Sequence, residues 1–220
     1  MVPTRARPGS RSVGAPATTT FLAAAVAMFV FTGLGDASNQ WFQDLAQFNQ
    51  AVAAGQWWRI FTVVLLHASF SHLLFNMWAL WALGPQIERG VGTGPFVGLY
   101  IASAGVGGAF AFHLGGILDA GVGASGAIFG IFGVWLSWAF HRRGTATGRA
   151  MLGQLGFLLL INAALPILIP NISWQAHLGG LLCGLLIGEA WDRIKGANAV
   201  QMRTAVTFVV AVAAVVSVLI

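Results

Sequence analysis

The residues Gly123-Ala124-Ser125-Gly126 open an apolar stretch that runs from Ala124 to Phe140. A second apolar stretch further along the chain contains Ala176-His177-Leu178-Gly179-Gly180. Polar side chains at membrane depth usually face the interior of a helix bundle and usually mark a functional site. These two stretches therefore predict an all-α membrane bundle in which a serine and a histidine are buried for a chemical reason.

The composition supports a membrane protein. Of the 220 residues, 57% are hydrophobic and only 8% are charged, whereas soluble domains carry about 25% charged residues. The formal net charge is +5, but no basic cluster is interleaved with aromatic residues on a polar face, so we expect no nucleic-acid partner. The single cysteine, Cys183, excludes an internal disulfide framework and a cysteine-based zinc site.

The apolar runs divide the chain into three parts. Residues 1–17 resemble a disordered cytoplasmic tail, residues 18–203 form the predicted membrane domain, and residues 204–220 form an additional C-terminal transmembrane helix. Each run is near the roughly 20 residues that a spanning helix needs. The predicted spans are Thr18–Gly35, Phe70–Glu88, Pro95–Leu114, Ala124–Phe140, Met151–Ile169, Trp174–Trp191 and Ala205–Ile220.

The segment from Asp36 to Ser69 interrupts these spans. Tryptophan and phenylalanine are scattered in it among glutamine and asparagine. Aromatic residues with polar neighbours are typical of the headgroup level of a bilayer. We therefore expect a loop that lies partly in the interface and contains short amphipathic helices.

The basic residues predict an orientation. With the N-terminus inside, seven spans place every Lys and Arg except Arg59 on the cytoplasmic side, as the positive-inside rule requires. The expected location is the inner, or plasma, membrane, with a cytoplasmic N-terminus and the C-terminus outside.

Glycine spacing predicts which helices are neighbours. Gly180, Gly184 and Gly188 recur every four residues on the sixth span, and Gly126, Gly130 and Gly133 mark one face of the fourth. Small residues at this spacing let membrane helices approach closely. Both spans begin on the outer side, so packing through these glycines would bring Ser125 and His177 together.

Ser125 and His177 suit nucleophilic catalysis. A serine hydroxyl is a weak nucleophile and needs an adjacent base. Gly123 and Gly126 allow a turn into the helix and close approach of a substrate backbone, and N–H groups at a helix N-terminus suit an oxyanion. The alternative is a motif that only packs helices, with Ser125 as a helix cap. On this motif alone, the packing role is the better interpretation.

The second span adds His67, His72 and Asn76. His72 and Asn76 are four residues apart and share a helix face, and both can donate hydrogen bonds to an oxyanion. Histidine at such spacing also suits a metal site, but asparagine is a weak zinc ligand, and no nearby Asp, Glu or Cys completes a ligand set. We expect no metal and no cofactor.

Together these motifs resemble the rhomboid family of intramembrane serine proteases. The resemblance covers residues 57–188, and the order and spacing of five separate motifs make it specific. The residues that carry it are Trp58-Arg59, His67, His72-x-x-x-Asn76, Glu88, Gly123-x-Ser125-Gly126 and Ala176-His177-x-x-Gly180. The last span resembles that of the subgroup with one extra C-terminal helix.

The resemblance implies a rhomboid-like fold and a Ser–His dyad without a triad aspartate. Ser125 would be the nucleophile and His177 the general base, and the oxyanion hole would come from His72, Asn76 and the Ser125 backbone N–H. Glu88 would be a structural acid. Some rhomboids carry tyrosine four residues after the nucleophile, where this chain has Phe129. We therefore expect ring stacking on His177 without a hydroxyl contribution.

The expected partners are single-span membrane proteins, as substrates, and the lipid bilayer. Two rival functions stay open. A catalytically silent rhomboid-like protein would bind membrane helices without cutting them. A transporter with a midplane site would show inverted internal repeats, which this sequence lacks. Both rivals predict that Ser125→Ala leaves function intact.

Overall fold

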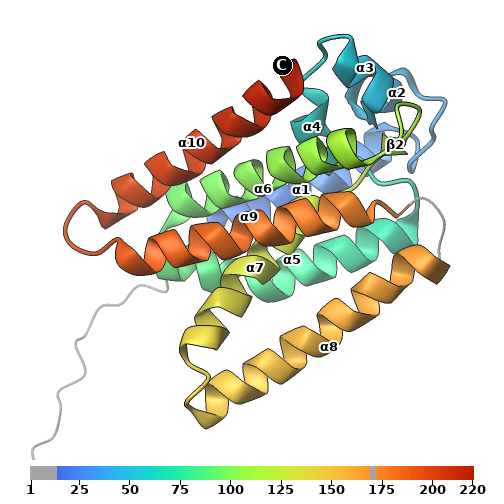
Figure 1. Ribbon diagram of the computed structural model, residues 1–220. Coiled ribbons are helices and arrows are strands. Elements are labelled where there is room, and N and C mark those ends of the chain that lie inside the picture. Colours follow the sequence, from blue (N-terminus) through green and yellow to red (C-terminus); the bar gives the residue numbers. More distant parts are fainter. Residues whose placement is uncertain (1–13, 169–171) are drawn as a thin grey trace, which may run out of the picture.

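The computed structural model describes residues 14–168 and 172–220, with the backbone alone for residues 162–168. The described chain is helical apart from two strands of two residues each, which confirms the predicted all-α class. Its long helices are α1 (Pro16–Phe31), α5 (Phe70–Val91), α6 (Thr93–Leu114), α7 (Ser125–His141), α8 (Ala146–Leu168), α9 (Trp174–Arg193) and α10 (Ala199–Leu219) (Figure 1).

These helices follow the predicted spans, with differences at the ends. Helix α1 stops at Phe31, before the predicted Gly35, because Gly33, Leu34 and Gly35 all have positive φ angles that end an α-helix. Helix α10 begins at Ala199, so the predicted boundary at residue 204 lies inside that helix. The predicted end of the fifth span at Ile169 and most of the predicted tail lie outside the described residues.

By length and hydropathy alone, fewer helices than the seven predicted spans qualify as membrane-crossing. Within the described residues, α6 and α10 are long and apolar enough to span a membrane, and the bent pair Arg59–Leu65 and Phe70–Val91 could count as a third. Helices α1 and α7 and the segment Ala146–Ile161 are apolar but shorter than that criterion. The prediction of about seven transmembrane helices therefore rests on the family and the bundle rather than on individual helices.

The segment between α1 and α5 contains the short elements α2 (Gln40–Leu45), β1 (Gln47–Phe48), α3 (Asn49–Ala53), α4 (Arg59–Thr62) and the 3₁₀ turn η1 (Val63–Leu65). Strand β1 pairs antiparallel with β2 (Ala120–Gly121), with Gln47 opposite Gly121. Arg59 fixes the segment by donating hydrogen bonds to the carbonyls of Gln43 and Ala46. This pattern agrees with the predicted loop of short helices.

Helices α7 and α9 pack through their glycines as the spacing predicts. A methyl group added at Gly180 would overlap the carbonyl of Gly126, and one added at Gly184 would overlap the carbonyl of Gly130. Close backbone approach of this kind holds membrane helices together where lipid removes the hydrophobic driving force. Helix α8 lies at the edge of the bundle and packs against α7 (Figure 1).

The helices run in alternating directions, which gives the bundle two distinct ends (Figure 1). We call one the basic end; it contains the start of α1 and the connections α5–α6, α7–α8 and α9–α10. The described Lys and Arg residues other than Arg59 lie there: Arg89, Arg142, Arg143, Arg149, Arg193, Lys195 and Arg203. The opposite end, with β1, β2 and the starts of α7 and α9, we call the site end.

Candidate active site

Ser125 is the first residue of α7, and its N-cap is Ala124. Alanine has no side chain that can accept a hydrogen bond from the first turn. In contrast, Ser69 caps α5 and Ser173 caps α9. The first N–H groups of a helix have no intrahelical acceptor, so the start of α7 offers uncapped donors beside the Ser125 hydroxyl.

Gly123 is the position where the turn into α7 requires glycine. Its φ angle is 122°, which residues with a side chain rarely adopt. A methyl group there would lie 2.6 Å from Nε2 of His72, so glycine also makes room for that imidazole. The Gly123 N–H donates to the carbonyl of Val63 at 3.0 Å, which fixes the loop in front of Ser125.

His177 lies in the first turn of α9, whose N-cap Ser173 accepts a hydrogen bond from the Ala176 N–H. Its imidazole stacks on the ring of Phe129, with ring centroids 4.2 Å apart and planes 8° from parallel. Phe129 is one helical turn after Ser125 on α7. The stack therefore sets the imidazole against the same helix that begins with the serine.

The backbones of α7 and α9 are also close to each other beside Ser125 and His177. A methyl group at Gly126 would touch the carbonyl of Ala176 at 3.5 Å, and these two residues are the chain neighbours of Ser125 and His177. Among the described residues, however, no hydrogen bond links the Ser125 hydroxyl with the His177 imidazole. The structure thus places the two side chains on neighbouring helices at the same level, without the hydrogen bond of a closed dyad.

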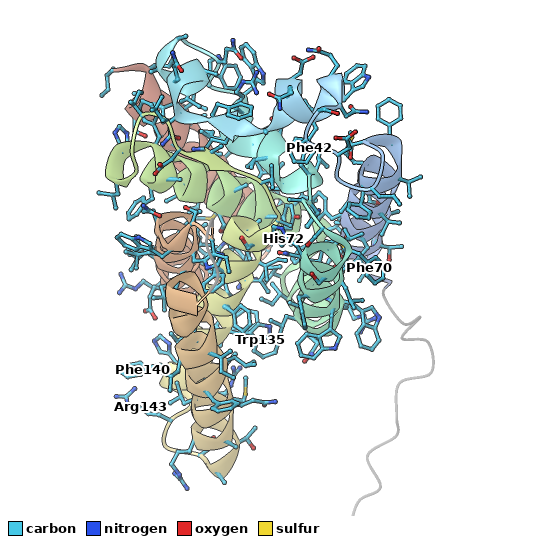
Figure 2. All side chains as sticks on the ribbon, turned by 90° about the vertical axis from the view of Figure 1, so that its right-hand side faces the viewer. Phe42, Phe70, His72, Trp135, Phe140 and Arg143 are labelled. Atoms are coloured by element: carbon cyan, nitrogen blue, oxygen red, sulfur yellow. The ribbon has the colours of Figure 1, made fainter. Side chains whose placement is uncertain are left out.

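His72 and Asn76 both lie on α5, where Asn76 is buried. The Asn76 side-chain amide donates to the His72 carbonyl at 2.9 Å, so one of its N–H groups is already engaged within the helix. In Figure 2, which looks onto the right-hand side of Figure 1, His72 lies near the centre of the view, below Phe42 and above Trp135.

His67 lies between η1 and α5 and is fully buried. Its ring meets the ring of His72 edge-on, with centroids 5.1 Å apart. In the part of the chain that the structure describes, neither ring nitrogen of His67 is in hydrogen-bonding geometry with a partner. His67 is therefore connected to the site through its ring contact with His72.

Two further residues of the site escaped the sequence analysis. Gly107 of α6 would, with a methyl group, lie 2.8 Å from the Ala176 carbonyl and 3.5 Å from the Gly126 Cα, so three helices converge there. The Val63 carbonyl is the acceptor for Gly123. The glycine-rich run Gly105-Val106-Gly107-Gly108 was a signal that could have revealed Gly107. No pattern in the sequence marks the Val63 carbonyl as a hydrogen-bond acceptor.

No three His, Cys, Asp or Glu side chains converge as a metal site within the described residues. The contacts of the histidines in this region are with Asn76, with Phe129 and with one another. The expectation of a site without metal or cofactor stays a prediction.

Comparisons with known proteins address the family. A profile described as the Rhomboid domain matches residues 54–191. The chain is 38% identical over 151 residues to the putative rhomboid protease YdcA of Bacillus subtilis strain 168, which covers 67% of this chain and 73% of that protein.

Two other relatives are longer than the shared region. Identity to the rhomboid protease GluP of the same organism is 34% over 169 residues, 74% of this chain and 32% of GluP. Identity to the rhomboid protease GlpG of Pectobacterium atrosepticum is 33% over 144 residues, 65% of this chain and 51% of GlpG. Since the profile spans more than half of the sequence and YdcA matches over most of its length, this multi-pass membrane protein belongs to the rhomboid family, whose named relatives are proteases.

Proposed function

We propose that the chain is an intramembrane serine endopeptidase that cleaves transmembrane segments of other membrane proteins near the outer face of the membrane. Ser125 is the nucleophile and His177 the general base, then the general acid. The observation that carries this proposal is the stack of His177 on Phe129, one turn below Ser125 on α7. It holds the only imidazole of α9 against the helix that begins with the serine.

The chemistry follows from these positions. His177 accepts the proton of the Ser125 hydroxyl as Oγ attacks the peptide carbonyl, and it then gives that proton to the leaving amine. The acyl-enzyme that remains is an ester of Ser125. A water molecule then attacks this ester as His177 takes its proton; the ester bond to Ser125 Oγ breaks, His177 returns the proton to Oγ, and the second product leaves as a carboxylic acid.

The tetrahedral intermediates carry an oxyanion, which needs preorganised donors. The uncapped N–H of Ser125 at the start of α7 is one donor. His72, whose Nε2 lies against Gly123, is the second. Asn76 is the third, through the amide hydrogen that is not donated to the His72 carbonyl.

The hydrogen bond between Ser125 and His177 is expected to form when a substrate binds. Catalytic hydrogen bonds are often long or misaligned without substrate and shorten in the complex. Phe129 has no hydroxyl, so stacking is the contact that orients the imidazole during this step. The two helices need little movement, because their backbones are already in contact at Gly126 and Gly180.

The proposed substrates are single-span membrane proteins with small, helix-destabilising residues near the outer face. Backbone groups of a helix in lipid are internally hydrogen-bonded, so a scissile bond must be partly unwound before Ser125 reaches it. The proposed setting is the inner, or plasma, membrane, with the N-terminus in the cytoplasm and the C-terminus outside. The gathering of basic residues at the end opposite Ser125 supports this orientation.

The first test uses purified protein in detergent and a fluorophosphonate probe, which labels activated serines. The wild type is compared with Ser125→Ala, His177→Ala and the control Ser137→Ala, which changes a serine at the basic end of the same helix α7. Labelling that is lost in the first two variants and kept in the control supports the proposal.

The second test is cleavage of a transmembrane peptide in liposomes by the same four proteins. A folded wild type that neither labels nor cleaves would overturn the protease function. That result would favour the alternative, a catalytically silent rhomboid-like protein that binds membrane helices.

A further inference from the structure

Helix α10 packs closely against the small residues of α6. A methyl group at Gly98 would overlap the Thr207 hydroxyl, and one at Gly94 would lie 3.1 Å from the Thr204 hydroxyl. Thr207 is fully buried in this interface. The start of α10 is also tied to α9, because the Arg203 guanidinium donates to the carbonyls of Trp191 and Ile194.

The last turns of α10 reach the site end, beside α3 (Figure 1). There Ala214 and Val218 are buried in an apolar cluster with residues from α3, α4 and α6. The members of this tether cluster are Val52, Ile60, Ala109, Ala214 and Val218. The C-terminal helix therefore covers the segment between α1 and α5 rather than standing apart in lipid.

Phe61 brings the tether cluster close to η1. At Gly105 of α6, a methyl group would lie 2.5 Å from the Phe61 ring and 3.3 Å from the Ala214 Cβ. The ring is thus enclosed between α6 and α10 on one side. On another side, Phe61 borders a cavity of about 80 Å³ that Val64 and Leu65 of η1 also line. The Phe61 ring therefore lies between the α6–α10 contact and a cavity that η1 lines.

The 3₁₀ element η1 holds the loop in front of Ser125. The Val63 carbonyl accepts the Gly123 N–H at 3.0 Å. Gly123 has the left-handed backbone that turns the chain into α7 and leaves room for His72. A shift of η1 therefore moves the peptide that sets the direction of the Ser125 N–H.

From this continuous set of contacts we infer that Ala214 and Val218 of α10 are positioning residues for the active site: they hold α4 and η1 so that Val63 fixes Gly123 and the oxyanion donors beside Ser125. The inference rests on the proposed function. It assigns the additional C-terminal helix a role in catalysis although no residue of it touches the site.

The test compares Ala214→Leu with Ala213→Leu. Both add the same atoms to neighbouring positions of α10, but Ala214 is buried against Gly105 and Phe61, whereas Ala213 is exposed on the lipid side. The expected result is a rate constant for fluorophosphonate labelling about tenfold lower in Ala214→Leu, since small displacements of catalytic groups are costly. Turnover of a transmembrane peptide falls by a similar factor with KM unchanged, because substrate entry is not affected.

A second readout follows the tether itself. Hydrogen exchange of the Gly123 amide, which donates to Val63, is expected to be about tenfold faster in Ala214→Leu than in Ala213→Leu, because looser packing opens the hydrogen bond more often. Val218→Ala is the milder variant in case Ala214→Leu does not fold, with the exposed Val216→Ala as its control. It is expected to change both readouts in the same direction.

The inference is overturned if both buried-face variants match their controls in labelling rate and in exchange. Slower labelling with unchanged Gly123 exchange also overturns it, because α10 would then act by another route. A merely structural role would lower the amount of folded protein but leave the labelling rate constant unchanged. If the wild type does not label at all, the proposed function fails, while the exchange measurement still decides whether α10 holds Gly123.

Discussion

The hydrogen bonding of selected polar side chains differs between the basic end and the site end of the bundle. At the basic end, the buried Glu88 carboxylate of α5 accepts hydrogen bonds from the backbone N–H groups of Ala17 and Thr18 and from the hydroxyls of Thr18 and Thr93. It therefore satisfies the first N–H groups of α1 and also contacts the start of α6. Nearby, the Ser137 hydroxyl of α7 donates to Glu189 of α9 at 2.8 Å.

At the site end, the Ser125, His72 and His177 side chains have no hydrogen bonds to one another among the described residues, although neighbouring polar side chains such as Arg59 and Asn76 are paired. These groups are held by ring stacking and by edge-on ring packing, and glycines beside them leave the space that their side chains occupy.

The difference separates stability from function. His67 is fully buried and its ring nitrogens have no hydrogen-bond partner among the described residues, an arrangement that costs roughly 1–3 kcal/mol, whereas Ser125, His72 and His177 are half-buried and can exchange water for a substrate. Side chains whose hydrogen-bonding atoms have partners, such as Glu88, join helices. Side chains that have atoms without such partners in the described part of the chain, such as His72 and His177, remain available to a substrate. Substitutions at the two ends should therefore affect different quantities, activity at one and the free energy of unfolding at the other.

The largest effect is expected for His177→Ala. Loss of the general base should lower turnover of a transmembrane peptide by about 10⁴- to 10⁶-fold, by analogy with removal of triad members in soluble serine proteases. The matched control is His141→Ala, which removes a histidine from the basic end of α7. An equal loss of activity in both variants would contradict the division between the two ends.

His72→Ala should come next, with turnover about 10²–10³-fold lower, the usual cost of one oxyanion donor. Asn76→Ala should cost about tenfold, because one N–H of its amide is already donated to the His72 carbonyl. Steady-state kinetics on a transmembrane peptide measure both. A larger loss for Asn76→Ala than for His72→Ala would show that the order of the two donors is wrong.

Glu88→Gln should act on stability. It replaces a carboxylate that accepts backbone and hydroxyl hydrogen bonds with an amide that can accept on one atom alone, which should lower the free energy of unfolding by about 3 kcal/mol. Unfolding in mixed detergent micelles measures this change. Turnover per folded molecule should stay within twofold of the wild type, and a selective loss of turnover would contradict the prediction.

The smallest effect is expected for Ser137→Ala. The variant removes one hydrogen bond to Glu189, whose side chain is 40% exposed, so water can replace the lost partner. A decrease of about 1 kcal/mol in the free energy of unfolding is expected, again by unfolding in micelles. An effect as large as that of Glu88→Gln would mean that pairing at the basic end depends little on burial.

Much of the fold could be predicted from local sequence. Helical spans are legible as apolar runs because a chain in lipid must satisfy its backbone hydrogen bonds within each helix. The spacing of Gly126, Gly130, Gly180 and Gly184 also gave the correct pair of neighbouring helices, since small residues at that interval permit close packing. Helix ends were less certain, as the early stop of α1 before Gly33 shows.

The amino-acid sequence by itself determined the membrane class, the approximate spans, the family resemblance and the set of candidate residues, because each of these depends on composition and spacing along one segment. Only the tertiary structure decided how those residues meet. Three contacts join residues far apart in the chain. They are the hydrogen bond from Gly123 to Val63, the hydrogen bonds from α1 backbone N–H groups to Glu88, and the packing of α10 near Phe61. Such contacts depend on how the helices are arranged in space, and apart from the glycine spacing of α7 and α9 no local pattern that we identified predicts that arrangement.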